Sequence, residues 1–284
     1  MFADDIKIYG IYGSGNCNEV RRALSTSLEK MNSWALQWDI PLNLNKTMVM
    51  HLGECEPFIY EVSGVKLTSC RSTKDLGVLF ESNLKFSTHI SRAVTKAYAA
   101  LFLILRNIRC SDPAILIRLY KAYVLPHLEY ASPVWNPKLK KEVRRIEKVQ
   151  QMFTRILWYR STASPERHLL PDYNERLRIF ALRSLEHRRT VSDLIFCFRV
   201  LRKEVRLPAS KYWIFRPTSA RSGGFSLHYP NIHKRHYSLL FDSLFYRGAR
   251  WLQLLPSEVL RVDNSKAFRK RLKNLDLSCI LSTT

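Results

Sequence analysis

The apolar residues of this chain change their spacing near residue 81, and this change constrains the fold more than any other feature of the sequence. Before it, short apolar runs bounded by Gly, Ser and Asn predict strands at residues 6–12, 47–52, 58–62, 65–68 and 75–80. One amphipathic helix is predicted among them, at 18–38. Ser63 and Gly64 predict a hairpin turn between the third and fourth strands. After residue 81 helical spacing takes over, so we expect an α+β chain.

The helical part contains several segments with apolar residues at helical spacing. These predict helices at 87–108, 113–124 and 138–158, and one or two more at 175–202. Asp112 and Pro113 are typical of a helix start, and we expect that helix to end near Val124, before Pro126. Residues 207–236 are aperiodic and predict loops, followed by a last helical pair at about 237–247 and 263–277.

Positive charge is concentrated in this helical part. The 284 residues include 46 Lys and Arg against 24 Asp and Glu, a net charge of +22. Residues 1–80 carry −1 and residues 81–284 carry +23. Lys and Arg gain affinity for polyanions by releasing counterions, so nucleic acid is the favoured partner. A solvated surface is the plainer alternative, and a membrane surface fits less well because no helix sets its basic residues opposite a continuous apolar face.

Several protein classes are disfavoured by what the sequence does not contain. Its longest apolar run, residues 97–105, is far shorter than the roughly 20 residues that span a bilayer. The N-terminus has no signal-peptide pattern, and the six cysteines lack the spacing of a zinc site or disulfide framework. We therefore expect an intracellular protein without a membrane partner. Nucleus and cytoplasm both fit, no targeting signal is readable, and no protein partner is indicated.

Two adjacent carboxylates, Asp4 and Asp5, stand between apolar residues near the start of the chain. Like charges repel each other, whereas a divalent cation is bound by several carboxylate oxygens at once. Two-metal phosphoryl-transfer sites use such carboxylates. A solvated acidic turn is the plain alternative, so the neighbouring residues decide between the two interpretations.

The neighbouring residues carry a family resemblance. The tetrapeptide Phe2-Ala3-Asp4-Asp5 resembles the aromatic-Ala-Asp-Asp turn of reverse transcriptases, and the order of later motifs is most similar to the non-LTR (long interspersed, jockey-like) retrotransposon class. Those motifs are Trp34 and Trp38, residues 41–47, 74–78, 83–90, 119–126, 128–135, 146–155, and the closing Phe268, Arg269 and Leu272. The resemblance therefore covers nearly the whole chain.

This resemblance implies a partial polymerase palm at residues 1–80, built of antiparallel strands plus a helix. A helical thumb at 81–160 and a basic, mostly helical region at 161–284 would follow. Asp4 and Asp5 would hold Mg²⁺ (or Mn²⁺) in the full-length polymerase, and Lys46 would act near the incoming nucleotide. Leu76, Gly77 and Val78 would position the primer. The implied partners are an RNA template and a DNA primer.

The residues themselves add one predicted contact surface and three plainer interpretations. The outward-facing basic residues of the helix predicted at 138–158 would bind phosphates; they are Lys138, Lys140, Lys141, Arg144, Arg145 and Lys148. Trp34 and Trp38 are expected to pack in the core rather than to stack on bases. Lys46 fits a solvated turn about as well as a phosphate contact. Gly77 is expected inside a strand.

The same resemblance implies that parts of a polymerase are missing. The fingers and the strand bearing a third catalytic carboxylate have no counterpart, so we expect the lone chain to be inactive, with an unpaired sheet edge and an exposed apolar face. The alternative is a non-catalytic module that binds RNA or RNA–DNA hybrid. A truncated gene relic is the third possibility.

Overall fold

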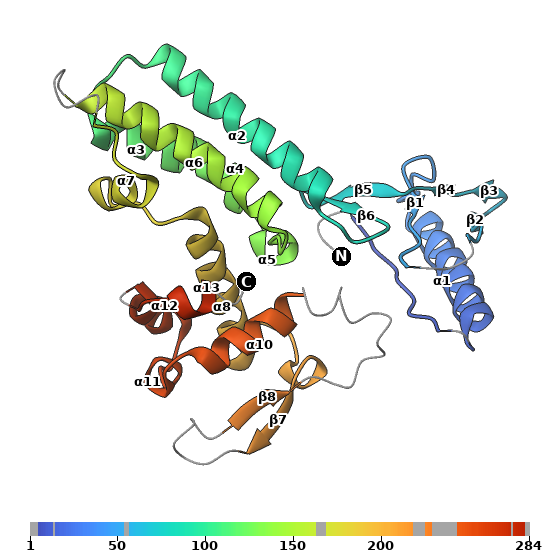
Figure 1. Ribbon diagram of the computed structural model, residues 1–284. Helices are drawn as coiled ribbons and strands as arrows, with labels where there is room; N and C mark the ends of the chain where they lie inside the picture. The colour runs from blue at the N-terminus through green and yellow to red at the C-terminus, as the bar shows by residue number, and fades with distance from the viewer. Residues whose placement is uncertain are drawn as a thin grey trace. The chain divides into compact units, whose positions relative to one another are not determined.

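The computed structural model describes residues 5–13, 15–53, 57–162, 169–217, 225–228, 243–273 and 275–281. Its internal contacts divide the chain into an N-terminal unit, Met1–Lys85, and a C-terminal unit, Phe86–Thr284. The first contains one long helix and short strands, and the second is mostly helical (Figure 1). This mixture of helix and small sheets agrees with the expected α+β class.

The N-terminal unit packs short strands against one helix. The helix is α1 (Cys17–Gln37), and the strands are β1 (Met48–Val49), β2 (Glu61–Val62), β3 (Val65–Lys66), β4 (Thr68–Ser69), β5 (Ser72–Asp75) and β6 (Val78–Glu81). A small cluster of Tyr60, Val62 and Leu67 packs with Leu24 and Leu28 of α1. The hairpin turn between β2 and β3 is confirmed at Ser63 and Gly64, both with positive φ.

Two strand predictions in this unit are wrong, and one pairing is unexpected. Residues 6–12 form no strand in the described part of the chain, because nothing there supplies a ladder of hydrogen bonds for them. Residues 75–80 are not one strand: Asp75 pairs with Val78 across a turn, so Gly77 is a turn residue. β1 and β4 pair in parallel rather than antiparallel.

The C-terminal unit begins with α2 (Ser87–Asn107) and α3 (Pro113–Leu119), both starting where predicted. The prediction that the second helix ends near Val124 is wrong. The helix continues through the π-helical turn η1 (Tyr120–Val124) into α4 (Leu125–Glu129). In η1 the Leu125 amide donates to the carbonyl of Tyr120, five residues earlier. This wider turn gives the Pro126 ring the room at the preceding carbonyls that an α-helix denies it.

The short helix α5 (Ser132–Trp135) leads to α6 (Lys140–Ser161), which lies along α2 (Figure 1). The buried rings of Tyr120 and Phe153 stack with centroids 4.1 Å apart. Arg160, near the end of α6, donates to the carbonyls of Leu105 and Ile108 at the end of α2. A cation at these unpaired carbonyls is favoured by the helix dipole, so α6 caps α2.

The predicted segment 175–202 consists of two helices, α7 (Tyr173–Ile179) and α8 (Leu185–Leu201). The short helix η3 (Ala209–Lys211) and the strand pair β7 (Ile214–Pro217) and β8 (Phe225–His228) lie in the segment expected to be loops. The described helices that follow are α10 (Leu244–Leu254), α11 (Ser257–Leu260), α12 (Ser265–Lys273) and α13 (Ser278–Leu281). Of the helix predicted at 237–247, residues 237–242 lie outside the described residues. α8, α10, α12 and α13 share one hydrophobic core. Within the described ranges, no helix has the length and apolarity needed to cross a membrane.

Candidate nucleic-acid interface

Of the two predicted metal ligands, Asp4 and Asp5, the structure describes one. Asp4 lies outside the described residues, and the side chain of Asp5 is exposed. No group of three or more potential metal ligands occurs among the described His, Cys, Asp and Glu residues. A Mg²⁺ or Mn²⁺ site takes several oxygen ligands, and Asp5 is the one predicted metal ligand that the structure describes.

The segment after Asp5 is fixed by two contacts. Gly10 lies so close to α1 that a Cβ there would be 2.4 Å from Cγ1 of Val20. Lys7 forms an ion pair with Asp75, the last residue of β5. This ion pair links the segment next to the acidic turn to the β5–β6 hairpin, so two parts of the predicted site adjoin each other within the N-terminal unit.

The hairpin turn holds the residues that the resemblance assigns to primer positioning. Leu76 and Gly77 have φ of +43° and +89°, a pattern that favours Asn-Gly or Gly-Gly. Leucine in this conformation is strained, yet its side chain is 48% exposed rather than packed. Val78, by contrast, is buried. An exposed apolar side chain at a strained turn is typical of a contact residue.

Lys46 lies in a compact turn closed by Asn43. The Lys46 amide donates to the side-chain oxygen of Asn43 at 3.1 Å, and the Thr47 hydroxyl donates to the Asn43 carbonyl at 2.9 Å. The ammonium group is exposed. The turn therefore fixes the backbone of Lys46 and leaves its charge in solvent, which is compatible with both interpretations of this residue.

The prediction that Trp34 and Trp38 pack in the core is wrong. They are 52% and 63% exposed, with ring centroids 6.5 Å apart on one side of α1. Ile6, Ile8, Tyr9, Ile11, Leu36 and Ile40 are also exposed. The three buried residues of the unit's core cluster are too few to cover these side chains, so the unit presents an apolar surface.

The outer face of α6 carries most of the predicted phosphate contacts. Lys138 precedes the helix, and Lys140, Lys141, Arg144 and Lys148 lie on it; all of these side chains are exposed. Arg145 is exposed too, but its guanidinium donates to the Ser91 hydroxyl of α2 at 2.8 Å. Arg145 therefore also ties α6 to α2, and the freer cations are Lys140, Lys141, Arg144 and Lys148, for which no ion pair is found among the described residues.

The inner face of the same helix contains polar residues that sequence reasoning missed. Glu147 accepts hydrogen bonds from the amides of Leu185 and Glu186, at 3.1 and 3.3 Å, and from the Tyr173 hydroxyl. It therefore satisfies the first amides of α8 in the way a capping carboxylate does. Gln150 accepts from Tyr120 and donates to Tyr173 and to the carbonyl of Arg183. The sequence did contain a signal for them, because helical spacing places these polar residues on the buried side of α6.

A second buried polar cluster holds α8 to its neighbours. Asp193, 0% exposed, accepts from Asn136 at 2.7 Å and from Arg247 at 2.9 Å. Arg189, 1% exposed, donates to Asn136 at 3.0 Å. Burial raises the pKa of the Asp193 carboxyl, and Arg247 opposes this shift. The cluster therefore links Asn136, after α5, with α8 and α10.

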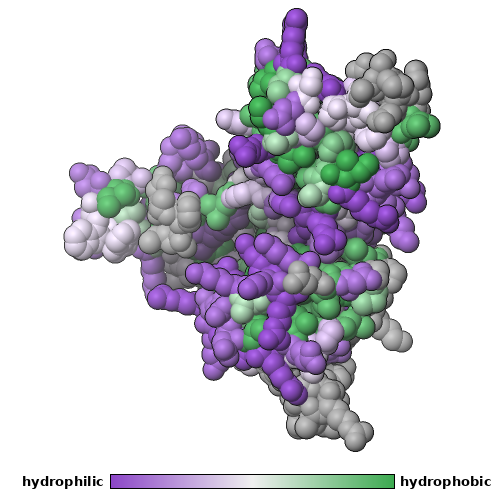
Figure 2. All heavy atoms as spheres, turned by 90° about the vertical axis from the view of Figure 1, so that its left-hand side faces the viewer, coloured by the Kyte–Doolittle hydropathy of each residue, from purple (hydrophilic) through white to green (hydrophobic). Residues whose placement is uncertain are grey.

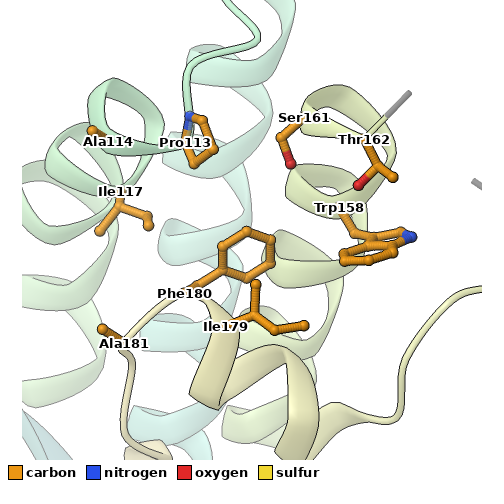
Figure 3. Close-up of a pocket in the computed structure, with 9 residues that line it drawn as sticks. All are labelled: Pro113, Ala114, Ile117, Trp158, Ser161, Thr162, Ile179, Phe180 and Ala181. Atoms are coloured by element: carbon orange, nitrogen blue, oxygen red, sulfur yellow. The ribbon is translucent and has the colours of Figure 1, made fainter. Parts of the chain in front are cut away.

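A shallow pocket of about 440 Å³ lies where α3 begins and α6 and α7 end (Figure 3). Its lining is mostly apolar and includes Trp158, Ile179 and Phe180, with the hydroxyls of Ser161 and Thr162 at one side. None of its nine lining residues is ionisable, so this pocket offers no acid, base or metal ligand. It does not coincide with the predicted site residues.

Comparison with known proteins finds distant relatives that match part of the chain. No family model matches the chain, and no solved structure matches it. It is 22% identical over 161 residues to the probable RNA-directed DNA polymerase from transposon X-element of Drosophila melanogaster, which covers 55% of this chain and 18% of that protein. It is 25% identical over 191 residues to the RNA-directed DNA polymerase from mobile element jockey of Drosophila funebris, covering 62% and 20%.

A third relative is an uncharacterized protein of Caenorhabditis elegans, 25% identical over 143 residues, which covers 50% of this chain and 70% of that protein. The chain thus spans 18% and 20% of the lengths of the two polymerases it matches. Over about half of its length or more, the chain is thus distantly similar to RNA-directed DNA polymerases of mobile elements.

Proposed function

We propose that this chain is a piece of a non-LTR retrotransposon reverse transcriptase that binds an RNA template and its DNA primer through the outer face of α6. The observation that carries this proposal is the division of α6 into two faces. Its inner face is filled by contacts to α7 and α8, whereas four exposed cations on its outer face lack described ion-pair partners. Uncompensated cations on a rigid helix suit the phosphates of a nucleic acid.

In this proposal the N-terminal unit is the later part of a palm and α2 to α6 are the thumb. The β5–β6 turn, with the exposed Leu76, would contact the primer. Asp4 and Asp5 would contribute carboxylates to a metal pair, whose chemistry is to stabilise the attacking and leaving oxygens. At least one further carboxylate from another segment is needed, so we expect no catalysis by this chain alone.

The binding part of the proposal is tested by salt dependence. Fluorescence anisotropy would follow the purified chain binding a labelled 20-base-pair RNA–DNA hybrid at increasing NaCl concentration. Replacing Lys140, Lys141, Arg144 and Lys148 by Gln removes up to four phosphate contacts, each contributing about 0.9 to the slope of log affinity against log salt. We expect a slope shallower by about 2 to 4 and weaker binding.

The matched control replaces four exposed cations of the N-terminal unit, Arg22, Lys30, Lys66 and Lys85, by Gln. This variant loses the same charge, so a general field effect would lower both slopes alike. A slope that stays unchanged in the α6 variant would remove this helix from the interface.

A second candidate function is a non-catalytic module that binds RNA or RNA–DNA hybrid. It is favoured by the isolation of Asp5, which belongs to no group of three potential ligands among the described residues. Replacing Asp4 and Asp5 by Ala separates the two. The readout is hybrid binding with and without Mg²⁺, because neither candidate predicts primer extension by this chain alone. Binding that survives the double change unaltered supports the module, whereas loss of a Mg²⁺-dependent part of the affinity supports the polymerase piece.

A further inference from the structure

The helix α12 carries four basic residues in a single stripe. Lys266, Arg269, Lys270 and Lys273 stand at positions i, i+3, i+4 and i+7, which an α-helix places on one face, and all four are exposed. The stripe is about 10 Å long at 1.5 Å per residue. Phe268 and Leu272 occupy the opposite face and are fully buried. The stripe and the buried face thus lie on different sides of α12, and the exposed Arg271, outside the stripe, donates to the carbonyl of Glu258.

Three contacts hold α12 in a fixed orientation. The ring of Phe268 stacks on Phe198 of α8, with centroids 4.1 Å apart and planes 7° from parallel. Asn264 caps the helix by accepting from the Ala267 amide at 2.9 Å. Glu204, in the loop after α8, accepts from the Ser265 amide at 2.7 Å. These contacts hold α12 so that its basic stripe faces outward.

No described carboxylate forms an ion pair with the stripe. α12 itself contains no acidic residue. Like charges at i and i+4 destabilise a helix, and α12 has two such pairs. Figure 2 shows hydrophilic residues, interspersed with hydrophobic ones, over one face of the molecule. The arrangement opposes stability and is explained by an external anion.

We propose that this stripe is a second contact for the nucleic-acid backbone, separate from α6. This inference rests on the proposed function and adds a surface that extends binding beyond the thumb to the C-terminal helices. Nucleic acid is favoured over a lipid surface because Phe268 and Leu272 are buried, which leaves α12 no apolar side chain to insert between lipids. Phosphates spaced along a strand match a row of cations on a straight helix.

The test replaces Lys266, Arg269, Lys270 and Lys273 by Gln in the full chain and repeats the hybrid titration beside the α6 variant and the N-terminal control variant. We expect affinity to fall and the salt slope to become shallower by about 1 to 3, with less change in the control. Combining the α6 and α12 substitutions should reduce the slope further than either set alone. Gln keeps helix propensity high, and far-UV circular dichroism checks that folding is retained.

The outcomes separate this inference from the function on which it rests. A chain whose unaltered form shows no salt-dependent binding contradicts both. Binding that the α6 variant loses and the α12 variant keeps contradicts only the second contact. If the α12 variant binds the hybrid normally but loses binding to vesicles of phosphatidylserine and phosphatidylcholine, the stripe is a lipid contact and the inference is wrong. A misfolded quadruple variant would be replaced by Lys270→Gln with Lys273→Gln, for which half the slope change is expected.

Discussion

At the scale of single residues, the crossing of α8 and α10 leaves no space at Gly248. A Cβ at this position would lie 2.2 Å from Sγ of Cys197 and 3.3 Å from its Cβ. We therefore expect Gly248→Ala to lower the free energy of unfolding by about 1–3 kcal/mol, because the two helices must move apart. Urea titration followed by circular dichroism measures the change.

The control is Gly13→Ala, where the added Cβ meets nothing within 4 Å and the change should stay within about 0.5 kcal/mol. Cys197→Ala removes the sulfur from the contact. In a double-mutant cycle its combination with Gly248→Ala should therefore cost less than the sum of the two single changes. Strict additivity would show that the close approach is not the cause.

Two histidines of the C-terminal unit make its stability depend on pH. Burial lowers the pKa of His89, with Lys96 adding to the effect, and burial and Arg183 lower the pKa of His187. As the pH falls, the unfolded chain, with histidine pKa values of about 6.5, therefore binds protons at a higher pH than the folded chain does. The contribution of the two neutral imidazoles to the free energy of unfolding is complete above about pH 6.5 and is lost as the pH falls below this value.

We expect the urea midpoint to decrease between about pH 7.5 and pH 5.5, and the decrease to be smaller when His89 and His187 are both replaced by Gln. Carboxylates whose pKa values shift would still contribute to the remaining pH dependence. An identical decrease in the double variant and the unaltered chain would exclude these two imidazoles as its source.

At the scale of elements, the β5–β6 hairpin forms although its turn places a leucine in an unfavourable backbone conformation. Leu76 occupies a left-handed conformation that costs a residue with a Cβ about 1–2 kcal/mol, a cost that Asn largely avoids. Leu76→Asn should therefore raise the free energy of unfolding by about 1 kcal/mol while removing the exposed leucine side chain. Thermal denaturation tests this, and Leu52→Asn, at an exposed leucine without positive φ, should give no gain.

The same hairpin connects stability to the proposed function. If Leu76 contacts a primer, Leu76→Asn stabilises the chain and weakens hybrid binding at once. Loss of stability in this variant would mean that the side chain packs in a way that its exposure does not indicate.

The inner face of α6 carries the strongest expected effect of a single side chain. Glu147→Ala leaves the first amides of α8 and the hydroxyl of Tyr173 without their acceptor. We expect a loss of about 2–4 kcal/mol in the free energy of unfolding, measured by urea titration. Glu175→Ala, at an exposed carboxylate on α7, is the control and should change little.

The helices could be predicted because burial on one face repeats a signal every three to four residues, and α1, α2 and α6 lie within three residues of their predicted ends. The turn that interrupts the strand expected at 75–80 could not be predicted, because Leu76 stands where Asn would have indicated a turn. The helix through Pro126 could not either, since its π-helical turn is a local backbone adjustment without a residue signature.

For the candidate site, the exposure of the basic residues on α6 follows from helical spacing and was predictable. Helical spacing also places Glu147 and Gln150 on the buried side of α6, but their partners could not be predicted, because these lie 23 to 39 residues away in the sequence. Trp34 and Trp38 show the opposite case: a large apolar residue predicts a core only where other elements are present to cover it.

At the scale of the whole molecule, charge opposes folding. With a net charge of +22, repulsion among cations destabilises the compact state, and salt screens repulsion at distances beyond about 10 Å at 0.1 M. We therefore expect the Tm to rise when NaCl increases from about 0.05 M to about 0.5 M, while affinity for nucleic acid falls. Differential scanning fluorimetry measures the first trend; a Tm that falls with salt would mean that attractive ion pairs dominate.

The two faces of α6 also limit which length changes the chain can tolerate. One residue added between Lys148 and Val149 would rotate everything beyond it by about 100° relative to everything before it. The hydrogen bonds of Gln150 to Tyr173 and Arg183, beyond the insertion, and the row of outward cations before it could then no longer both stay in place. Substitutions on the outer face would be accepted one at a time, whereas an insertion or deletion inside this helix would separate its two roles in a single step.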